Sequence, residues 1–345
     1  MKIGSGFFIR WAAPLAVGVA ALIWALEAPR SGAEEATVVI GHFPNLTHVQ
    51  GVIGHARGDF DRALAGEAVI DWKVFNAGPS AIEALFAGKL DITYIGPSPA
   101  VNAYVKSGGD AVRVVAGAAS GGAALVVRSD SGIEKPEDFR GKKIASPQLG
   151  NTQDVALRSW LGANGLKLKE TGGDVRVLPL ANADQVTLLL KKEIDAAWTV
   201  EPWVSILTTS AGARVFLEES SLWPDGRYST ALVLVRREFL EKHPAIVKQF
   251  LAEHVRLTEW ARSNPDEAKR VAREAIEAWT HKELPQAIVD SAWARLRFDT
   301  DPLEASVLEQ ARAAHRAGYL KKEPDLSGLF EPGPLKEVLA QKPVE

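Results

Sequence analysis

The chain has 345 residues, of which 46% are hydrophobic and 24% are charged, with a formal net charge of −3 and no cysteine. This composition is typical of a folded globular protein of about two domains and excludes disordered, collagen-like and disulfide-rich chains. Without cysteine there is no cysteine zinc site, iron–sulfur cluster, thiol nucleophile or lipid-modified N-terminal cysteine, and without a basic tract there is no electrostatic basis for binding nucleic acid.

The first 33 residues have the features of a secretory signal peptide. Lys2 and Arg10 precede an apolar run over residues 11–26, and small residues follow up to Ala33. The run is shorter than the ~20 residues that span a bilayer, so we expect cleavage near Ala33, with an uncleaved anchor as the alternative. Both interpretations place the rest of the chain outside the cytoplasm, in the periplasm. Cleavage leaves 37 basic and 42 acidic residues, a net charge of −5, so any selectivity for an anion has to come from local geometry.

From residue 36 to about residue 235, strands alternate with helices. The predicted strands lie at 37–41, 69–75, 91–95, 143–146, 175–180 and 195–200. The helical patterns that follow them lie at 47–65, 80–86, 98–105, 152–163, 183–192 and 202–209. This alternation predicts an α/β fold of βαβ units with mainly parallel sheets flanked by helices.

Two similar segments are predicted to cross between two lobes, AALVVR at 123–128 and TALVLVR at 230–236. Residues 36–124 and 233–320 are then expected to form lobe one with its C-terminal helices, and residues 125–232 lobe two. After Arg237 the pattern is wholly helical, with amphipathic stretches near 244–263, 265–278, 283–297 and 303–317. Residues 321–345 are rich in Pro, Lys and Glu and are expected to form a tail.

Helix-capping patterns occupy the turns that follow the strands. They are the boxes that begin at Thr47, Ser80 and Asn182, the Ser98-Pro99 pair, and Asn151 or Thr152 after Gly150. These turns lie at the carboxyl ends of the strands, where an open α/β sheet forms a ligand crevice. Several helix N-termini at one crevice would bind an oxyanion through backbone N–H groups without an arginine, although any one cap by itself usually only starts a helix.

Glycines accompany these caps in Gly78-Pro79-Ser80, Gly96-Pro97-Ser98 and Gly121-Gly122. We expect them where the backbone approaches a ligand, with tight packing as the alternative.

Aromatic and charged side chains stand at the same turns. Trp198 is expected either to shield an organic ligand or to pack inside its lobe. Glu201 has three interpretations: it caps the next helix, pairs with a cation across the lobes, or receives the ammonium group of a zwitterion. His42 and His48 are candidate donors to an oxyanion.

Metal and catalytic motifs do not appear. His48 and His55 are seven residues apart, without a carboxylate at ligand spacing, so we expect no metal site. The motifs G-x-S-x-G, H-E-x-x-H, G-x-x-x-x-G-K-[ST] and G-x-G-x-x-G are absent from the sequence, and we therefore expect neither an enzyme nor a cofactor.

Four segments resemble a known family. They are GHFPNLTH at 41–48, GKLDITYIGP at 88–97, EKPEDFRGK at 134–142 and WTVEPW at 198–203. They are similar to periplasmic solute-binding proteins of ABC importers for nitrate, sulfonate, taurine and bicarbonate, above all to the aliphatic-sulfonate branch. The resemblance implies a two-lobed type II periplasmic-binding-protein fold that closes on a small anion or zwitterion at a hinge. It also implies a partner, a membrane permease driven by a cytoplasmic ATPase, and we expect the binding protein itself to be a monomer.

The resemblance also implies a ligand site shared by the two lobes. The implied contacts are Asn45, Thr47, Gly78, Ser80, Ser98, Ser120 and Gly121 from lobe one and Gln148, Asn151, Thr152 and Glu201 from lobe two. We add His48 and Trp198 to the expected ligand contacts, because they lie at the same turns.

The expected ligand is an aliphatic sulfonate or a taurine-like anion, and the alternatives are nitrate, bicarbonate and a thiamine-precursor pyrimidine. A sensor subunit for a membrane kinase is the alternative role. The thiamine-pyrimidine synthases of the same fold family are the enzyme alternative, against which the missing cysteine and the export signal argue.

Overall fold

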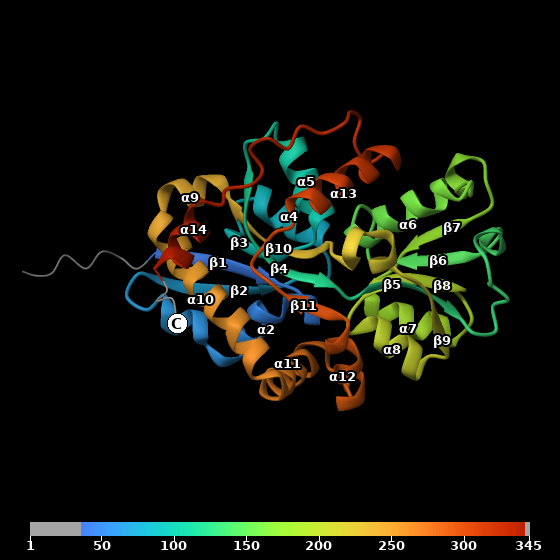
Figure 1. Cartoon of the computed structure of the whole chain (residues 1–345), viewed down its shortest axis with the longest axis horizontal. Coiled ribbons are helices and arrows are strands. Elements are labelled where there is room, and N and C mark those ends of the chain that lie inside the picture. Colours follow the sequence, from blue (N-terminus) through green and yellow to red (C-terminus); the bar gives the residue numbers. More distant parts are fainter. Residues whose placement is uncertain (1–35, 342–345) are drawn as a thin grey trace, which may run out of the picture. The chain divides into compact units, whose positions relative to one another are not determined.

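Two β-sheets organise the chain in this computed structural model, which describes residues 36–341 (Figure 1). The larger sheet has the strand order β11-β4-β10-β3-β1-β2, and the smaller has the order β7-β6-β8-β5-β9. The strands of the larger sheet are β1 (Ala36–His42), β2 (Ala68–Val74), β3 (Ile92–Ile95), β4 (Val112–Gly121), β10 (Ser229–Arg236) and β11 (Leu296–Phe298). Those of the smaller sheet are β5 (Ala123–Arg128), β6 (Lys143–Ser146), β7 (Arg176–Pro179), β8 (Ala196–Val200) and β9 (Ala213–Glu218). Each sheet with its helices is called a lobe below, the first lobe containing the larger sheet.

Both sheets are mixed, which corrects the prediction of mainly parallel sheets. β1 pairs with β3 in parallel, and β6 pairs in parallel with β7 and β8. However, β10 is antiparallel to β3 and β4, and β5 is antiparallel to β8 and β9. These two strands run opposite to their neighbours because the chain enters a lobe from the other lobe with each of them: it enters the smaller sheet with β5 and returns to the larger sheet with β10.

The two segments predicted to cross between the lobes are therefore sheet strands, β5 and β10. The crossings themselves lie just before them, at Gly121-Gly122 and over residues 219–228. Gly121 and Gly122 have φ of +81° and +74°, a left-handed conformation that side-chain-bearing residues rarely adopt, so glycine suits this abrupt turn between two strands.

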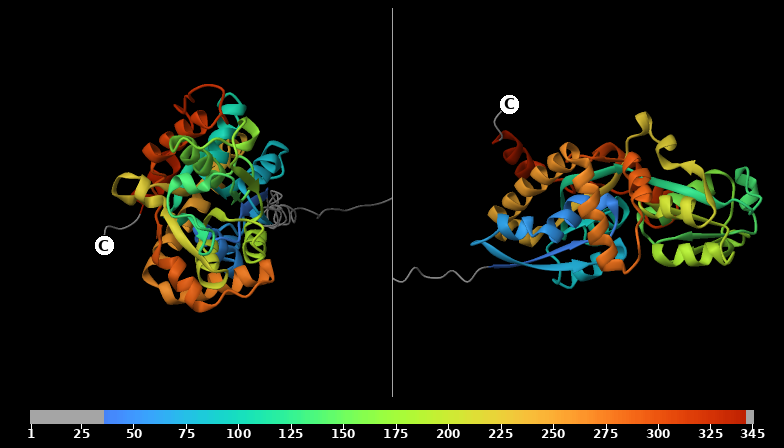
Figure 2. Two further views of the ribbon diagram at one scale, coloured as in Figure 1. Left: turned by 90° about the vertical axis from the view of Figure 1, so that its right-hand side faces the viewer. Right: turned by 90° about the horizontal axis from the view of Figure 1, so that it is seen from below.

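Helices cover both faces of the larger sheet (Figures 1 and 2). Neighbouring residues of β3 face opposite sides, because side chains alternate along a strand. Ile95 packs in the core with residues of α4, α5 and α13, whereas the Tyr94 hydroxyl bonds His254 of α10 at 2.9 Å. The helices and short 3₁₀ turns assigned to this lobe are η1 (Leu46–His48), α2 (Val49–Arg57), α3 (Asp59–Ala63), α4 (Gly78–Phe86), α5 (Pro97–Lys106), α9 (Arg237–Lys242), α10 (Pro244–Ser263), α11 (Pro265–Thr280), α12 (Gln286–Ala294), α13 (Glu304–Arg316) and α14 (Gly333–Ala340).

The smaller sheet is also covered on both faces. Trp198 of β8 packs with Leu157 of α6 and Phe139, and its neighbour Ala197 packs on the other side with Val204 of α8. The helices and turns here are η2 (Pro136–Phe139), α6 (Thr152–Ala163), η3 (Lys169–Thr171), α7 (Asn182–Leu190), α8 (Trp203–Ser210), η4 (Glu219–Leu222) and η5 (Pro224–Gly226).

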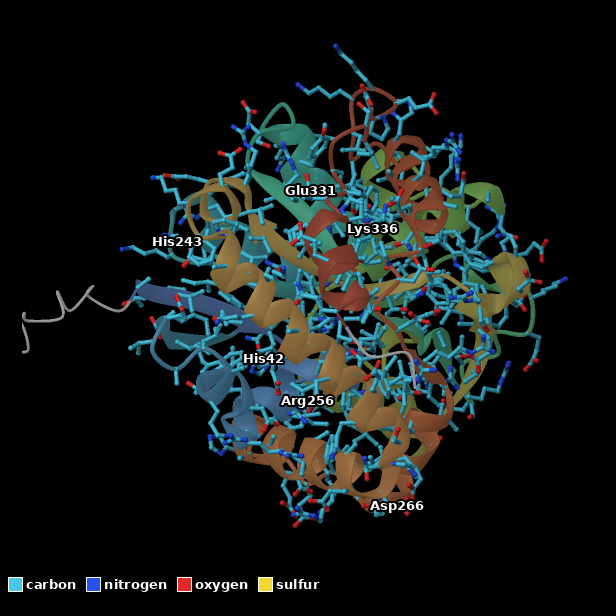
Figure 3. The ribbon with its side chains drawn as sticks, turned by 60° about the vertical axis from the view of Figure 1, so that its left-hand side comes forward. His42, His243, Arg256, Asp266, Glu331 and Lys336 are labelled. Carbon is cyan, nitrogen blue, oxygen red and sulfur yellow. The ribbon has the colours of Figure 1, made fainter. Side chains whose placement is uncertain are left out.

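The C-terminal region differs from the predicted run of helices followed by a tail. β11 interrupts the helices and pairs with β4, and residues 321–341 are part of the first lobe. Leu326 and Leu329 are buried in its core. Figure 3 shows α14, which carries the labelled Lys336, beside α10. Lys248 Nζ of α10 lies 2.9 Å from Glu337 of α14. The apolar residues of this segment are spaced by Pro, Lys and Glu, which hides their periodicity in the sequence.

Residues 1–35 and 342–345 lie outside the described part of the chain, and the predicted signal peptide falls on the first of these segments. Between residues 36 and 341, no helix is both long and apolar enough to cross a membrane.

Candidate functional site

A polar cavity lies where strand ends of the two lobes meet, and we call it the interlobe cavity. Its volume is about 20 Å³, slightly more than a single water needs. Its lining comes from the first lobe with Phe43, Asn45, Thr47, His48, Asn76, Gly96 and Thr230, and from the second with Pro147, Asn151, Thr152, Gln153, Asn182 and Val200. Most of these residues lie in the turns and first helical residues that follow the carboxyl ends of β1, β2, β3, β6 and β7, which is where open α/β sheets bind ligands.

His48 is a neutral hydrogen-bond donor in this cavity. The backbone N–H of Phe43 donates to His48 Nδ1 at 3.2 Å, so Nδ1 is the acceptor and the ring hydrogen is on Nε2. Burial, with a smaller contribution from nearby His42, lowers the pKa of His48 to about 3, so the ring carries no charge at neutral pH. Nε2 forms no hydrogen bond with another of the described residues, so its N–H is available to a ligand.

Two asparagine amides are oriented so that their NH₂ groups are available. The indole Nε1–H of Trp203 donates to Asn45 Oδ1 at 2.9 Å, and an indole N–H cannot accept, so the oxygen must face Trp203. Asn182 Oδ1 accepts from the hydroxyl of Thr199 at 2.8 Å and from Gln185 Nε2 at 3.3 Å. Each amide therefore presents its donor side to the cavity.

The second lobe adds a helix N-terminus. Asn151 caps α6, since its Oδ1 accepts the backbone N–H of Gln153 at 3.0 Å, which again leaves its NH₂ group as a donor. The positive end of the helix dipole points to the same region. Among residues 36–341, no lysine or arginine lines the cavity. The site consequently offers neutral N–H and O–H donors, the arrangement that stabilises an oxyanion without a counter-charge.

The cavity brings together five of the residues expected from the sequence: Asn45, Thr47, His48, Asn151 and Thr152. The other eight, Gly78, Ser80, Ser98, Ser120, Gly121, Gln148, Trp198 and Glu201, do not line it. Sequence reasoning did not name Asn76 or Thr230, and it named Asn182 as a helix cap but not as a ligand contact. Asn182 closely follows β7, and its place after a strand is a signal that could have added it to the expected contacts.

Trp198 and two serines have other partners. Trp198 is fully buried in the core of the second lobe and donates to Glu219 Oε2 at 2.7 Å, which fits the packing alternative. The Ser80 hydroxyl donates to the carbonyl of Ala77 at 2.8 Å, and Ser120 Oγ accepts the backbone N–H of Tyr228 at 3.4 Å.

Of the helix caps predicted at Thr47, Ser80, Ser98, Asn182 and Asn151, Asn151 is the one whose side chain caps its helix. Helix α4 begins at Gly78 and α5 at Pro97, so Ser80 and Ser98 lie inside the first turn. Proline is favoured at the first helical positions, and each Gly-Pro pair starts the helix earlier than the serine that follows it. Asn182 is itself the first residue of α7, and Thr47 lies within η1.

The glycines at these turns are explained by contacts within the protein. A Cβ on Gly96 would lie 2.4 Å from Thr152 Oγ1, in the other lobe, and a Cβ on Gly78 would lie 2.3 Å from Pro99. A Cβ on Gly122 would lie 2.4 Å from Leu296. The packing alternative therefore accounts for them, and at Gly96 the close contact is between the lobes.

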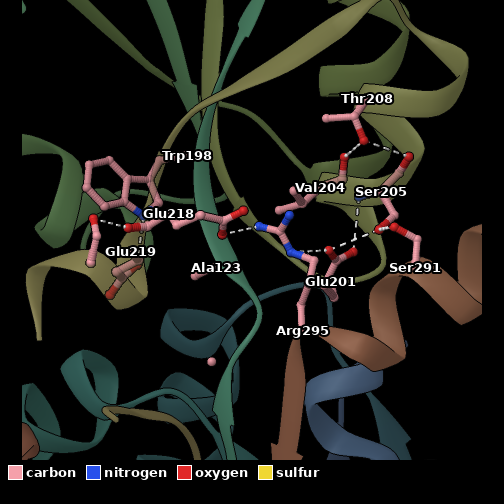
Figure 4. Close-up of polar contacts among 12 residues, drawn as sticks. Ala123, Trp198, Glu201, Val204, Ser205, Thr208, Glu218, Glu219, Ser291 and Arg295 are labelled. Carbon is pink, nitrogen blue, oxygen red and sulfur yellow. Dashed lines mark hydrogen bonds and ion pairs between the residues drawn. The ribbon is translucent and has the colours of Figure 1, made fainter. Parts of the chain in front are cut away.

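Glu201 caps a helix and forms an ion pair across the lobes (Figure 4). Its carboxylate accepts the backbone N–H and the hydroxyl of Ser205, both at 3.0 Å, and lies 2.9 Å from Nε of Arg295, which follows α12. Burial raises its pKa to about 7 although Arg295 opposes the shift. Glu201 thus fits two of its three interpretations, the helix cap and the partner of a cation across the lobes. Since Ser205 and Arg295 already contact its oxygens, the structure gives no support to the third interpretation, a site for an ammonium group.

His42 does not line the interlobe cavity. Its Nε2 lies 2.9 Å from Nδ1 of His55, whose ring stacks between Trp72 and Trp279 at centroid distances of 4.5 and 4.9 Å. Desolvation, reinforced by His55, lowers the pKa of His42 to about 3. Within residues 36–341 no group of three or more His, Asp or Glu side chains is arranged to hold a metal ion.

Comparison with known proteins identifies the family. Residues 31–276 match the NMT1-like family. The chain belongs to this family. The NMT1-like chain is 30% identical over 214 residues to the taurine-binding periplasmic protein of Escherichia coli (strain K12), which covers 61% of this chain and 63% of that relative. It is 28% identical over 222 residues to a putative aliphatic sulfonates-binding protein of Bacillus subtilis (strain 168), covering 63% of each.

Solved structures show the same fold. The alkanesulfonate-binding protein SsuA from Xanthomonas axonopodis pv. citri, bound to MOPS, matches this NMT1-like protein with a TM-score of 0.72 and 22% identity, over 87% of this chain and 99% of that one. The periplasmic nitrate-binding protein NrtA from Synechocystis PCC 6803 matches with a TM-score of 0.75 and 15% identity, over 90% of each chain. The predicted two-lobed periplasmic-binding-protein fold is confirmed.

Proposed function

We propose that this NMT1-like protein is the extracytoplasmic substrate-binding subunit of an ABC importer and that it binds an aliphatic sulfonate or a taurine-like anion between its lobes. The observation that carries the proposal is the set of neutral donors at the interlobe cavity: His48 Nε2–H and the amides of Asn45, Asn151 and Asn182. The names of the relatives, taurine-binding and aliphatic sulfonates-binding, support binding of the same class of anion.

Binding is coupled to closure because the donors come from both lobes. Asn45 and His48 belong to the first lobe, and Asn151 and Asn182 to the second, so only the closed form presents them together. A ligand then stabilises closure by its higher affinity for the closed form. The membrane permease is proposed to recognise the closed form. The binding protein itself acts as a monomer and not as an enzyme.

Nitrate or bicarbonate is the second candidate ligand. The observation in its favour is the small volume of the interlobe cavity, about 20 Å³, because nitrate and bicarbonate need less room than an organic sulfonate. The fold shared with a nitrate-binding protein is compatible with it. A thiamine-precursor pyrimidine fits less well, because the aromatic rings among the described lining residues, Phe43 and His48, already pack against each other at a centroid distance of 4.4 Å.

A thermal-shift screen tests the proposal. Taurine, alkane sulfonates, nitrate, bicarbonate and a thiamine-precursor pyrimidine are each added to the purified protein lacking residues 1–33. A ligand at about 100 times its Kd adds about 2.7 kcal/mol to the free energy of unfolding, which raises Tm measurably. We expect the largest shift with a sulfonate. A shift with nitrate or bicarbonate alone selects the second candidate, and no shift with any anion overturns the proposal.

Two further measurements test role and location. Small-angle scattering with and without the stabilising anion should show closure of the lobes. Mass spectrometry of the protein from a periplasmic extract should show a chain that begins after Ala33. A permease gene and an ATPase gene beside this one favour import, whereas a membrane-kinase gene favours the sensor role.

A further inference from the structure

A second, larger cavity of about 760 Å³ opens beside the interlobe cavity and shares Thr152 with it. We call it the lateral cavity. One wall is a face of α6 in the second lobe, the opposite wall is a face of α13 in the first lobe, and the crossing segment 219–227 closes one side. Its size is that of a pocket for a whole organic molecule, within the range of roughly 300–1,000 Å³.

The walls of the lateral cavity are largely apolar and aromatic. Val155, Ala156 and Trp160 line it from α6, and Leu222 and Trp223 from the crossing segment. The ring of Trp223 stacks on Tyr228 at a centroid distance of 5.6 Å and an angle of 11°, which holds the indole in place. Leu222 is 49% exposed, so its side chain is accessible from the cavity.

The charges at the lateral cavity are unbalanced toward the negative. Glu309 pairs with Arg316 at 2.9 Å, and Asp301 lies 4.0 Å from Arg227. The remaining two carboxyl groups of the lining, Glu219 and Glu304, form no ion pair within residues 36–341. Glu219 is buried and accepts from Trp198 at 2.7 Å, and burial raises its pKa to about 7, so a cation beside it would favour its charged form. Both basic residues of the lining are paired, and two acidic residues have no basic partner.

Buried polar atoms at the same cavity lack partners. Gln310 donates through Nε2 to the carbonyl of Ser229 at 2.9 Å, so its Oε1 is a free acceptor. The hydroxyl oxygen of Ser98 is also unpartnered, and both residues are only 5% exposed. Such unpaired buried groups destabilise a folded protein and mark places where a bound molecule completes the hydrogen bonds.

The backbone at the start of α13 is strained next to the cavity. Leu303, a lining residue, has φ of +53°, a conformation unusual for a bulky side chain, and it occupies the position before the helix where Ser, Asn or Gly is favoured. Strain of this kind concentrates at ligand sites, where a particular side chain is retained for its contact.

We propose that the lateral cavity binds a protonated primary amine with an aromatic body. The ammonium group is placed near Glu219 and Glu304, with Gln310 Oε1 as a further acceptor, and the ring lies between Trp160 and Trp223. The positive charge compensates the two unpaired carboxylates, and aromatic walls suit both a flat ring and a cation.

An amine in the lateral cavity would contact both lobes, because α6 and α13 form its opposite walls. Its binding therefore favours the arrangement in which these helices face each other. If the anion of the proposed function favours the same closed arrangement, each ligand raises the affinity of the other by the same factor. The site itself does not depend on that anion.

Titration calorimetry with phenethylamine, in the absence of any candidate anion, tests the site. Phenylacetate and 2-phenylethanol serve as probes with the opposite charge and with no charge. We expect phenethylamine to bind at least tenfold more tightly than either. Equal binding of the three probes, tighter binding of phenylacetate, or no binding of phenethylamine overturns the proposal, whatever the outcome of the anion screen.

Three variants locate the bound amine. Glu219→Gln keeps an oxygen that accepts from Trp198, and Glu304→Gln alters a more exposed position, so the second is informative if the first does not fold. Each should weaken phenethylamine about tenfold. Ala313→Phe fills the cavity from α13 and should abolish binding, whereas Ala317→Phe, outside the lining, should not. Unchanged phenethylamine affinity in Ala313→Phe contradicts the proposed location. A final titration of taurine, with and without saturating phenethylamine, measures the coupling separately.

Discussion

The indole of Trp203 in the second lobe donates to the side-chain oxygen of Asn45 in the first lobe at 2.9 Å. This hydrogen bond joins the lobes and also turns the NH₂ group of Asn45 toward the interlobe cavity. A contact that stabilises closure thereby orients a donor for the proposed ligand.

Trp203→Phe removes that donor while keeping an aromatic ring in place. Asn45 loses its fixed orientation and its oxygen is left without a partner, which costs about 1–3 kcal/mol in a buried site. We expect about a tenfold higher Kd for the anion selected in the screen, measured by calorimetry.

Trp198→Phe is the matched control, because it also removes an indole donor but inside the core of the second lobe. We expect it to lower Tm and to leave the Kd for the anion nearly unchanged. A result in which both variants change the Kd equally contradicts the role given to Trp203.

Asn182→Asp replaces a neutral donor with a negative charge at the interlobe cavity. The oxygen that accepts from Thr199 and Gln185 is preserved, so the local fold is expected to persist. Like charges in close contact cost several kcal/mol, and we expect the anion affinity to fall at least ~100-fold. Asn164→Asp adds the same charge at an exposed position and should leave the affinity unchanged, as measured by calorimetry on both variants. Retained binding in Asn182→Asp excludes this amide from the site.

Gly96→Ala tests whether ligand binding needs full closure. The new Cβ would lie 2.4 Å from Thr152 Oγ1 across the lobes, while φ of −74° at Gly96 is accessible to alanine. The open form tolerates the methyl group and the closed form does not. We therefore expect at least a tenfold weaker affinity and little change in the Tm of the free protein.

Gly162→Ala is the control for that substitution, since no atom lies within 4 Å of its Cβ position in α6. Alanine is a better helix former than glycine, so this control should raise Tm and leave the affinity unaltered. Normal affinity in Gly96→Ala would show that the contact with Thr152 is dispensable.

Glu201→Gln tests the effect of the raised pKa on stability. Burial raises the pKa of Glu201 from its usual 4.5 to about 7. Between these pH values the native state keeps a proton that the unfolded state has released, so this group lowers the free energy of unfolding as pH rises, by about 3 kcal/mol in total. The difference between the wild type and Glu201→Gln should change by that amount from pH 4.5 to pH 7.5 in urea unfolding.

Glu218→Gln is the control for the ion pair, because Glu218 contacts the same Arg295 but is half-exposed. It therefore measures, at a single pH, what the loss of one contact with Arg295 costs. A flat difference for Glu201→Gln over that range of pH would mean that the buried carboxyl titrates normally.

The sequence by itself determined the α/β class, most of the element positions and the family resemblance. The strand at residues 143–146 and the helix at 244–263 have their predicted bounds, because periodicity and flanking prolines act over short distances. The sequence did not reveal β4, whose VRVVAGAASG run of small residues lacks alternation, or α14 in the supposed tail. These elements are stabilised by contacts with distant parts of the chain.

Only the tertiary structure decided which polar residues share the site. Asn45 and Asn182 are donors because Trp203, Thr199 and Gln185 bind their oxygens, and such orientation depends on partners that no local pattern specifies. Glu201 likewise has a side chain that could bind a ligand, but its carboxylate pairs with Arg295, which lies far along the chain. Strand ends can be read from a sequence because they are local, whereas the direction in which each amide points is fixed by the packing of two lobes.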